Sequence, residues 1–195
     1  HVEGEPLAEP RNIPFKTGRR KKQWNKNVVS FGLASGFLEP LESTSIHLIQ
    51  AGLRRLVQHF PHNGIRESEI DEFNRQSQIE FEKIRDFIIL HYKVNQRADS
   101  QFWIDCRNME IPECLAHRIE LFRSSGKVFK DNDELFHEIA WQQVMIGQRL
   151  VPEDYHPLAH SISGDQLQGL LRDLKSLIGT TVEKLPTHDA FLKAQ

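Results

Sequence analysis

The sequence has few cysteines, no long apolar run and no excess of charge of either sign, and each absence argues against a class of protein. Only Cys106 and Cys114 are present, and two cysteines with no signal peptide before them fit reduced thiols better than a secreted disulfide scaffold. No stretch approaches the roughly 18 apolar residues that a membrane-spanning helix needs. The 25 Lys and Arg residues nearly balance the 27 Asp and Glu residues, which gives no electrostatic attraction to nucleic acid or to an anionic membrane. We therefore expect a soluble, cytoplasmic protein with no nucleic-acid or membrane partner.

Recognisable metal-ligand and catalytic spacings are missing as well. The ten histidines do not follow the metalloprotease spacing, and the two cysteines are expected to be small buried hydrophobic residues, so we predict no metal site. No Ser/His/Asp or Cys/His constellation is visible. We expect the basic run Gly18–Lys22 to be a solvated face rather than a phosphate clamp, and His47 to be a packed or surface residue rather than a ligand. The three tryptophans are expected in the core rather than stacked on a substrate: Trp24, Trp103 and Trp141.

What is present is a series of amphipathic helical segments behind a short apolar run, in a chain of 195 residues that suffices for one large or two small domains. The run Val28–Ala34 is rich in β-branched and small residues and predicts a buried strand. From Ser43 to Phe60, apolar residues recur at steps of three and four, which predicts an amphipathic helix. Further helices are predicted over 68–93 with Ser68 as the N-cap, over Gln101–Asn108, from Pro112 to a stop at Gly126, over Asp133–Ile146, and over Asp165–Ile178 before Gly179. The expected fold class is mainly α, with a short strand segment before a helical domain.

The elbow between the expected strand and the first helix, with the sequence SGFLEPLESTSIHL, carries the clearest chemistry. A helix start leaves its first backbone N–H groups without intrahelical partners, and the helix dipole adds roughly half a positive charge there. Ser43 as the N-cap would direct the amides of Thr44 and Ser45 towards a small anion or an electron-rich cofactor edge. The small residues 34–36 would let a flat ligand approach the backbone.

Two carboxylates flank Pro40 in this elbow. Glu39 and Glu42 are suited to act as an acid or base, or to orient a positively charged group. The alternative from the pattern alone is that both glutamates only decorate a helix start, and that Ser43 only caps it.

The run Trp24–Leu53 closely resembles the flavin-dependent tryptophan halogenases, in which the same strand, small-residue turn, E-P-L-E-S-T and helix lie beside the flavin. The resemblance extends upstream into FKTGRRKKQWNKN, and downstream into EFEKIRDFIILHY, FWIDCRNM, IELFRSSGKVF and VMIGQRLVPEDYHPLAH. It implies that residues 1–42 form the end of an FAD-binding α/β domain of the flavin monooxygenase type, its last strand and elbow. Residues 43–195 would form a helical substrate-side domain.

The resemblance also implies an activity and a set of site residues. Family members take reduced FAD from a separate flavin reductase, form a flavin hydroperoxide with oxygen, and use bound chloride or bromide to make hypohalous acid. This oxidant passes through a tunnel to a lysine and a glutamate beside an aromatic substrate such as tryptophan or indole. By motif, Thr44 and Ser45 would bind the halide through backbone amides, Glu42 would be the active-site glutamate, and Ser43 would couple the flavin side to the substrate side. Cofactor contacts are expected in the same segment, at Gly36, Leu38 and Ile46.

The chain departs from the family pattern in two ways. Glycine often follows the threonine in family members, whereas this chain has Ser45. The G-x-G-x-x-G fingerprint, the tunnel lysine and the W-x-W-x-I-P signature, all upstream in family members, are not in these residues. We therefore expect a C-terminal piece of a longer protein, beginning here at His1 and inactive by itself. Two alternative functions stay open: a related flavin-dependent aromatic monooxygenase and a non-catalytic helical interaction module. Also open are whether the protein forms a homodimer and whether its substrate pocket includes Phe136 and Trp141.

Overall fold

The computed structural model describes residues 4, 7–9, 11–131 and 134–194, and in this part of the chain helices dominate. Four two-residue strands pair as two antiparallel ladders, β1 (Gly18–Arg19) with β4 (Gly36–Phe37) and β2 (Trp24–Asn25) with β3 (Val28–Val29). The helices that follow are α1 (Thr44–Gln58), α2 (Glu67–Lys93), α3 (Gln101–Asn108), α4 (Glu113–Ser125), α5 (Glu138–Gly147), α6 (Gly164–Lys184) and α7 (His188–Lys193). Short 3-10 turns cover Gly32–Ala34, Pro40–Glu42 and Pro157–Ser161. The expected fold class, mainly α with a short strand segment, is confirmed.

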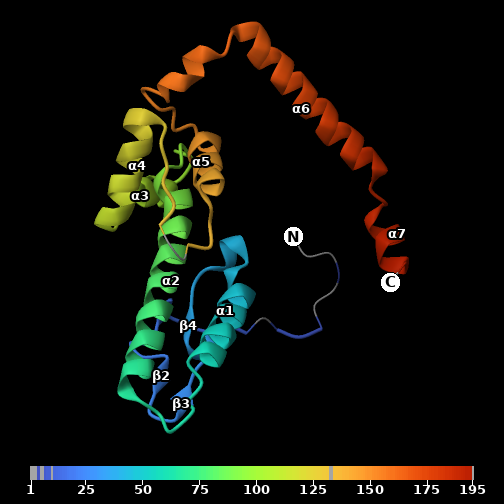
Figure 1. Cartoon of the computed structure of the whole chain (residues 1–195). Helices are drawn as coiled ribbons and strands as arrows, with labels where there is room; N and C mark the ends of the chain where they lie inside the picture. Colours follow the sequence, from blue (N-terminus) through green and yellow to red (C-terminus); the bar gives the residue numbers. More distant parts are fainter. Residues whose placement is uncertain (1–3, 5–6, 10, 132–133, 195) are drawn as a thin grey trace.

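Helix α2 is the long central element on which the other parts are assembled. Figure 1 shows α1 and the strands beside one half of α2, with α3, α4 and α5 around its other end. Asn74 in the first half of α2 anchors β2, because its Oδ1 accepts from the amides of Gln23 and Trp24 at 2.8 and 2.9 Å and its Nδ2 donates to the Trp24 carbonyl at 2.8 Å. The indole of Trp24 packs edge-on against Phe73, so this end of α2 has its own small apolar cluster.

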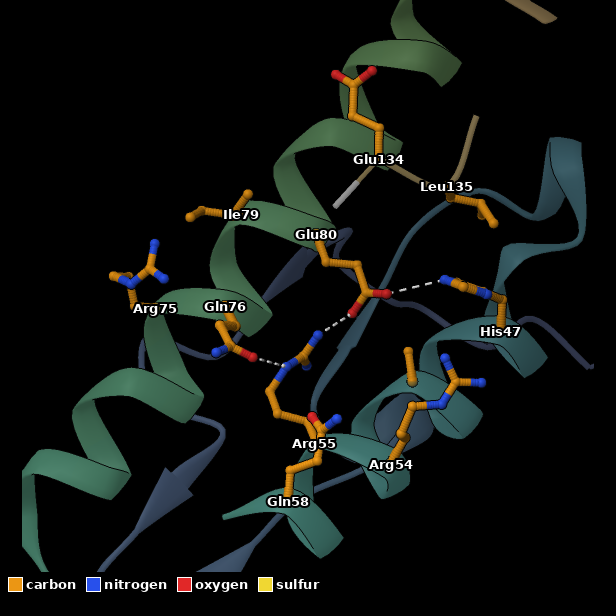
Figure 2. A pocket seen from close by; sticks show the side chains of 11 residues that line it. His47, Arg54, Arg55, Gln58, Arg75, Gln76, Ile79, Glu80, Glu134 and Leu135 are labelled. Carbon is orange, nitrogen blue, oxygen red and sulfur yellow. Dashed lines mark hydrogen bonds and ion pairs between the residues drawn. The ribbon is translucent and has the colours of Figure 1, made fainter. Parts of the chain in front are cut away.

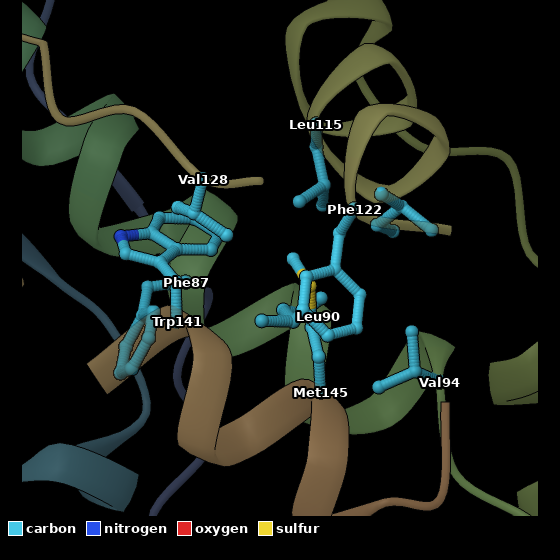
Figure 3. Close-up of a cluster of buried hydrophobic side chains, with 9 residues drawn as sticks. Phe87, Leu90, Val94, Leu115, Phe122, Val128, Trp141 and Met145 are labelled. Atoms are coloured by element: carbon cyan, nitrogen blue, oxygen red, sulfur yellow. The ribbon is translucent and has the colours of Figure 1, made fainter. Parts of the chain in front are cut away.

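The main hydrophobic core lies at the other end of α2. Figure 3 shows Trp141 and Met145 of α5 facing Leu115 and Phe122 of α4 across side chains of α2. The buried members of this core are Phe87, Leu90, Val94, Leu115, Ile119, Phe122, Val128, Trp141 and Met145. Truncating one of the large aromatic side chains here would cost about 3–5 kcal/mol of unfolding free energy.

Helix α6 has an apolar stripe that nothing in the described chain covers. Figure 1 shows α6 as an arm that runs away from the bundle, and none of its residues is buried. The exposed apolar side chains on it are Leu167, Leu170, Leu171, Leu174, Leu177, Ile178 and Val182. A helix with such a face is stabilised by packing against another surface rather than by its propensity alone.

The structure corrects several boundaries. The expected strand over Val28–Ala34 is only Val28–Val29, because Gly32 has a φ of 57° and the chain turns into a 3-10 helix there. The long helix begins at Glu67 with Arg66 as its N-cap, so the assignment of Ser68 to that place was wrong. The segment expected over Asp133–Ile146 is helical only from Glu138, and Asp133 itself lies outside the described residues.

Of the remaining helix predictions, two are confirmed and one helix end is corrected. Gln101–Asn108 is helical as predicted, and Gly126 ends α4 in the left-handed conformation with a φ of 66°. The last predicted helix does not stop at Gly179 but continues to Lys184. One glycine within a helix costs only about 1 kcal/mol, whereas Pro186, two residues after the end, cannot extend the helix.

Candidate functional site

The elbow is built by a 3-10 turn followed by one residue in a left-handed conformation. After the turn at Pro40–Glu42, Ser43 has φ 52° and ψ 33°, and its amide donates to the Pro40 carbonyl at 3.0 Å. A non-glycine residue in this region costs on the order of 1 kcal/mol. Ser43 is the N-cap residue of α1, as predicted, but its side chain makes no capping hydrogen bond. A residue that caps through its side chain normally has an extended backbone, and this one is left-handed.

The bend leaves the first amides of α1 without protein acceptors. Within the part of the chain that the structure describes, no hydrogen bond is made by the backbone N–H of Thr44 or of Ser45. The Thr44 residue is 2% exposed, and Ser45 is half-buried. Two unpaired N–H groups at the positive end of a helix of 15 residues form a position that favours an anion.

Two consecutive residues near the end of α2 hold the two elbow carboxylates. Nε2 of His91 lies 3.1 Å from Oε1 of Glu42. The hydroxyl of Tyr92 donates to Oε1 of Glu39. Burial of the phenol, together with its bond to the Glu39 carboxylate, raises the pKa of Tyr92 to about 12. The end of α2 therefore fixes both sides of Pro40, about 50 residues away along the chain.

An aromatic stack supports Tyr92 from behind. Its ring is parallel to that of Trp103 on α3, with ring centroids 6.0 Å apart and an interplanar angle of 14°. The guanidinium of Arg97 lies 4.4 Å from the centre of the Trp103 ring, a favourable cation–π distance. Trp103 is thus half-buried beside the site rather than in the core, whereas Trp24 and Trp141 are core residues as predicted, each 2% exposed.

The residues proposed to contact a cofactor differ in their surroundings. A methyl group on Gly36 would lie 2.7 Å from the Gly18 carbonyl oxygen and 2.7 Å from Cζ of Phe81, so the small size of Gly36 serves the packing of β4 on β1 and α2. Leu38 is half-buried, and Ile46 on α1 is 69% exposed. Their assignment as cofactor contacts stays a prediction.

A polar cavity of 530 Å³ lies between α1 and α2, behind the elbow. Figure 2 shows Arg55 and His47 of α1 reaching Glu80 of α2. Nη2 of Arg55 is 2.7 Å from Oε2 of Glu80, and Nε2 of His47 is 3.0 Å from Oε1. Arg55 also donates to the Ser77 hydroxyl at 2.9 Å and to the Gln76 amide oxygen at 3.3 Å. These groups satisfy one another, so the network joins α1 to α2 and positions the elbow. His47 is half-buried within it.

The two cysteines are not buried, and the described residues contain no group of metal ligands. Cys106 is half-buried and Cys114 is exposed, so the expectation of buried cysteines was wrong. The thiol of Cys114 donates to Oδ2 of Asp86 at 3.2 Å, and partial burial of the thiol together with that carboxylate raises its pKa. Among the described residues, no group of three or more His, Cys, Asp or Glu side chains is placed to hold a metal ion. No helix in the same residues combines the length and apolar composition needed to cross a bilayer.

Neither His91 nor Tyr92 is singled out as a site residue by the sequence. Both residues lie in the last turn of α2, where the apolar stripe of the helix ends. The hydrophobic pattern therefore gives them no special role. Nothing in one sequence indicates that positions 91 and 42 meet, because the contact depends on how α2 packs beside the elbow.

A family model, a relative of known sequence and two solved structures all relate this chain to halogenases. The family model described as tryptophan halogenase matches residues 1–164. The tryptophan 7-halogenase RebH of Lentzea aerocolonigenes is 31% identical over 212 residues, which cover 98% of this chain and 39% of RebH. Among solved structures, the flavin-dependent halogenase Xcc4156 from Xanthomonas campestris is 48% identical with a TM-score of 0.92, over 99% of this chain and 39% of that protein. BrvH, a flavin-dependent halogenase from Brevundimonas sp. BAL3, is 44% identical with a TM-score of 0.92, over 100% of this chain and 39% of that one.

These relatives are much longer than the present sequence, which spans 39% of the length of RebH, Xcc4156 and BrvH. The match of the family model covers more than half of the chain, and the superposition on Xcc4156 includes nearly every residue. The chain therefore belongs to the tryptophan halogenase family of flavin-dependent halogenases.

Proposed function

We propose that this chain is the C-terminal part of an FAD-dependent halogenase that chlorinates or brominates tryptophan, indole or another electron-rich aromatic. Residues 1–42 complete the FAD-binding domain, and residues 43–195 form the helical substrate-side domain. Reduced flavin comes from a separate flavin reductase. The observation that carries this proposal is the pair of unpartnered amides at Thr44 and Ser45, two and three residues after Glu42.

The amide pair fits a halide better than it fits a larger anion. Thr44 and Ser45 offer two N–H groups, Thr44 is buried, and the neighbouring side chains are small hydroxyl residues rather than arginine or lysine. A phosphate group usually draws on more donors and a cationic side chain. A chloride or bromide ion needs few donors and gains from the helix dipole.

When bound, FAD would supply the oxidation of the halide by oxygen. The described residues are suited to contact one edge of a flavin rather than to hold the whole cofactor. The segment around Leu38 and Ile46 is partly exposed, as a contact surface requires. The G-x-G-x-x-G fingerprint that holds a dinucleotide is not in these residues. We therefore expect this chain alone to be inactive.

Two exposed apolar faces support the view that the chain works against a larger partner surface. One is the stripe on α6, and the other runs along α1 through Ile46, Ile49, Leu53 and Val57. Contiguous apolar surfaces of this kind mark docking sites. In the proposed assembly they pack against the part of the halogenase that holds FAD.

A halide-dependence experiment tests the proposal. The protein at the full length of its relatives is supplied with a flavin reductase, oxygen and an aromatic substrate, and products are followed by mass spectrometry with chloride, with bromide and without halide. Halogenated product that requires halide supports the proposal. Hydroxylated product without halide would instead support the related monooxygenase, and no product with either halide would leave the proposal without support.

A second experiment tests directly whether the amides of Thr44 and Ser45 bind the halide. Ser45→Pro removes one N–H at the second position of α1, where the first turn tolerates proline. We expect the KM for halide to rise by about 10-fold or more, the effect of one hydrogen bond to a charged group. Ser45→Ala is the matched control, because it removes the hydroxyl and keeps the amide. Equal halide KM values for the two variants would contradict the assignment.

A further inference from the structure

The imidazole of His91 is held in one orientation by its own helix. Nδ1 lies 2.8 Å from the carbonyl oxygen of Phe87, one turn earlier in α2. The ring also packs edge-on against the Phe87 ring, with centroids 5.0 Å apart and an interplanar angle of 87°. The side chain is 18% exposed. Nε2 is therefore left with one partner, Oε1 of Glu42, at 3.1 Å.

A carboxylate oxygen only accepts, so Nε2 of His91 is the donor in its contact with Oε1 of Glu42. We propose that His91 is the positioning residue for Glu42. The Nε2–H holds Oε1, which leaves Oε2 of Glu42 to face the reacting groups. This inference rests on the proposed function, because it assigns a role relative to Glu42.

The other charged groups around His91 are already engaged with different partners. Glu39 on the elbow accepts from Tyr92, and Lys93 on α2 donates to the carbonyl of Met109 at 2.7 Å. From the end of α5, the uncharged amide of Gln148 reaches the carbonyl of His91 at 3.5 Å. The ring also lies in the last turn of α2, where the helix dipole favours a cation.

The test separates product formation from flavin oxidation in the full-length protein. In His91→Phe the aromatic ring keeps its packing against Phe87 but loses the donor. We expect kcat for halogenation to fall by about 10- to 100-fold, as for a lost hydrogen bond to a charged group. The rate of reduced-flavin oxidation should change by less than about 2-fold. The yield of product per flavin oxidised then falls, which a general loss of structure would not produce.

His91→Gln restores a hydrogen-bond donor without the imidazole ring. Glutamine can donate a hydrogen bond to Glu42. We expect kcat to recover to within about 5-fold of the unmodified protein, while the KM for halide stays within about 2-fold in both His91 variants. His47→Phe and His47→Gln are the matched controls, because they alter the other histidine–glutamate contact, with Glu80, away from the elbow.

The outcomes distinguish this inference from the proposed function. If the unmodified protein forms no halogenated product, both fail. If it forms product and Glu42→Gln abolishes it, but His91→Phe leaves kcat unchanged, only the role of His91 is overturned. If the His91 and His47 variants lose product and flavin oxidation together and equally, the effect is structural and the role of His91 is likewise overturned.

Discussion

Replacing Gly36 with alanine should destabilise the entry to the elbow more than any other glycine-to-alanine change in the described chain. A methyl group there would lie 2.7 Å from the Gly18 carbonyl oxygen, 2.7 Å from Cζ of Phe81 and 2.9 Å from Cα of Arg19. All three distances are well inside van der Waals contact. Two of these atoms belong to the backbone of β1, so a change of rotamer cannot relieve the overlap.

The magnitude follows from how the overlap can be relieved. Either β4 separates from β1, which weakens the ladder pairing Gly18 with Phe37, or Phe81 leaves its buried position on α2. Overpacking of a tight site usually costs about 1–3 kcal/mol. Because backbone must move here, we expect the upper end, a loss of about 3 kcal/mol in the free energy of unfolding.

Urea unfolding followed by circular dichroism measures this loss, with Gly179→Ala as the matched control. No atom lies within 4 Å of a methyl group placed on Gly179 in α6, so alanine should stabilise that helix by about 0.5–1 kcal/mol. The two variants should therefore differ by about 3–4 kcal/mol. A difference below about 1 kcal/mol would refute the argument that Gly36 is required by close packing.

Two further predictions concern the contacts between α2 and the elbow region. The raised pKa of Tyr92, about 12 against an ordinary 10.0, favours the neutral phenol in the folded state; its contribution to stability is complete below pH 10.0 and is lost as the pH rises through about 12. In Tyr92→Phe, unfolding measured from pH 9 to 12 should lose this slope, and an unchanged slope would contradict the assignment. Arg55→Met should cost about 3 kcal/mol, because it leaves the Glu80 carboxylate, 13% exposed, with His47 alone. The double variant with Glu80→Met should regain part of that loss in urea unfolding, and an additive double-mutant cycle would show that the pair is not coupled.

The helices could be predicted from the sequence because their signals are local. The periodic apolar residues of α2 and the stop at Gly126 lie within a few turns of the structure they specify. The expected strand over Val28–Ala34 was wrong for the opposite reason. Its apolar composition suits a strand, but the left-handed backbone of Gly32 breaks the strand pairing. Because glycine adopts left-handed and extended conformations about equally easily, the sequence did not predict this break.

The candidate site could be located from the sequence but not described. The motif around Glu42, Ser43 and Thr44 gave its place, through the resemblance to a family. The left-handed conformation of Ser43 and the contact of His91 with Glu42 were not predictable, because both depend on long-range packing. The sequence separation between the two partners of that contact exceeds any helical or hairpin period.

Helix α2 explains how the proposed halide position at the start of α1 could keep its geometry. The amides of Thr44 and Ser45 point at a fixed place only if α1 keeps its orientation and the strained residue Ser43 cannot relax. α2 supplies both conditions: Glu80 holds α1 through Arg55 and His47, and the end of the helix holds the elbow through His91 and Tyr92. A single left-handed residue stores on the order of 1 kcal/mol of strain, and contacts on both sides of it oppose its relaxation. The central helix of the described chain therefore sets the geometry of the proposed anion position.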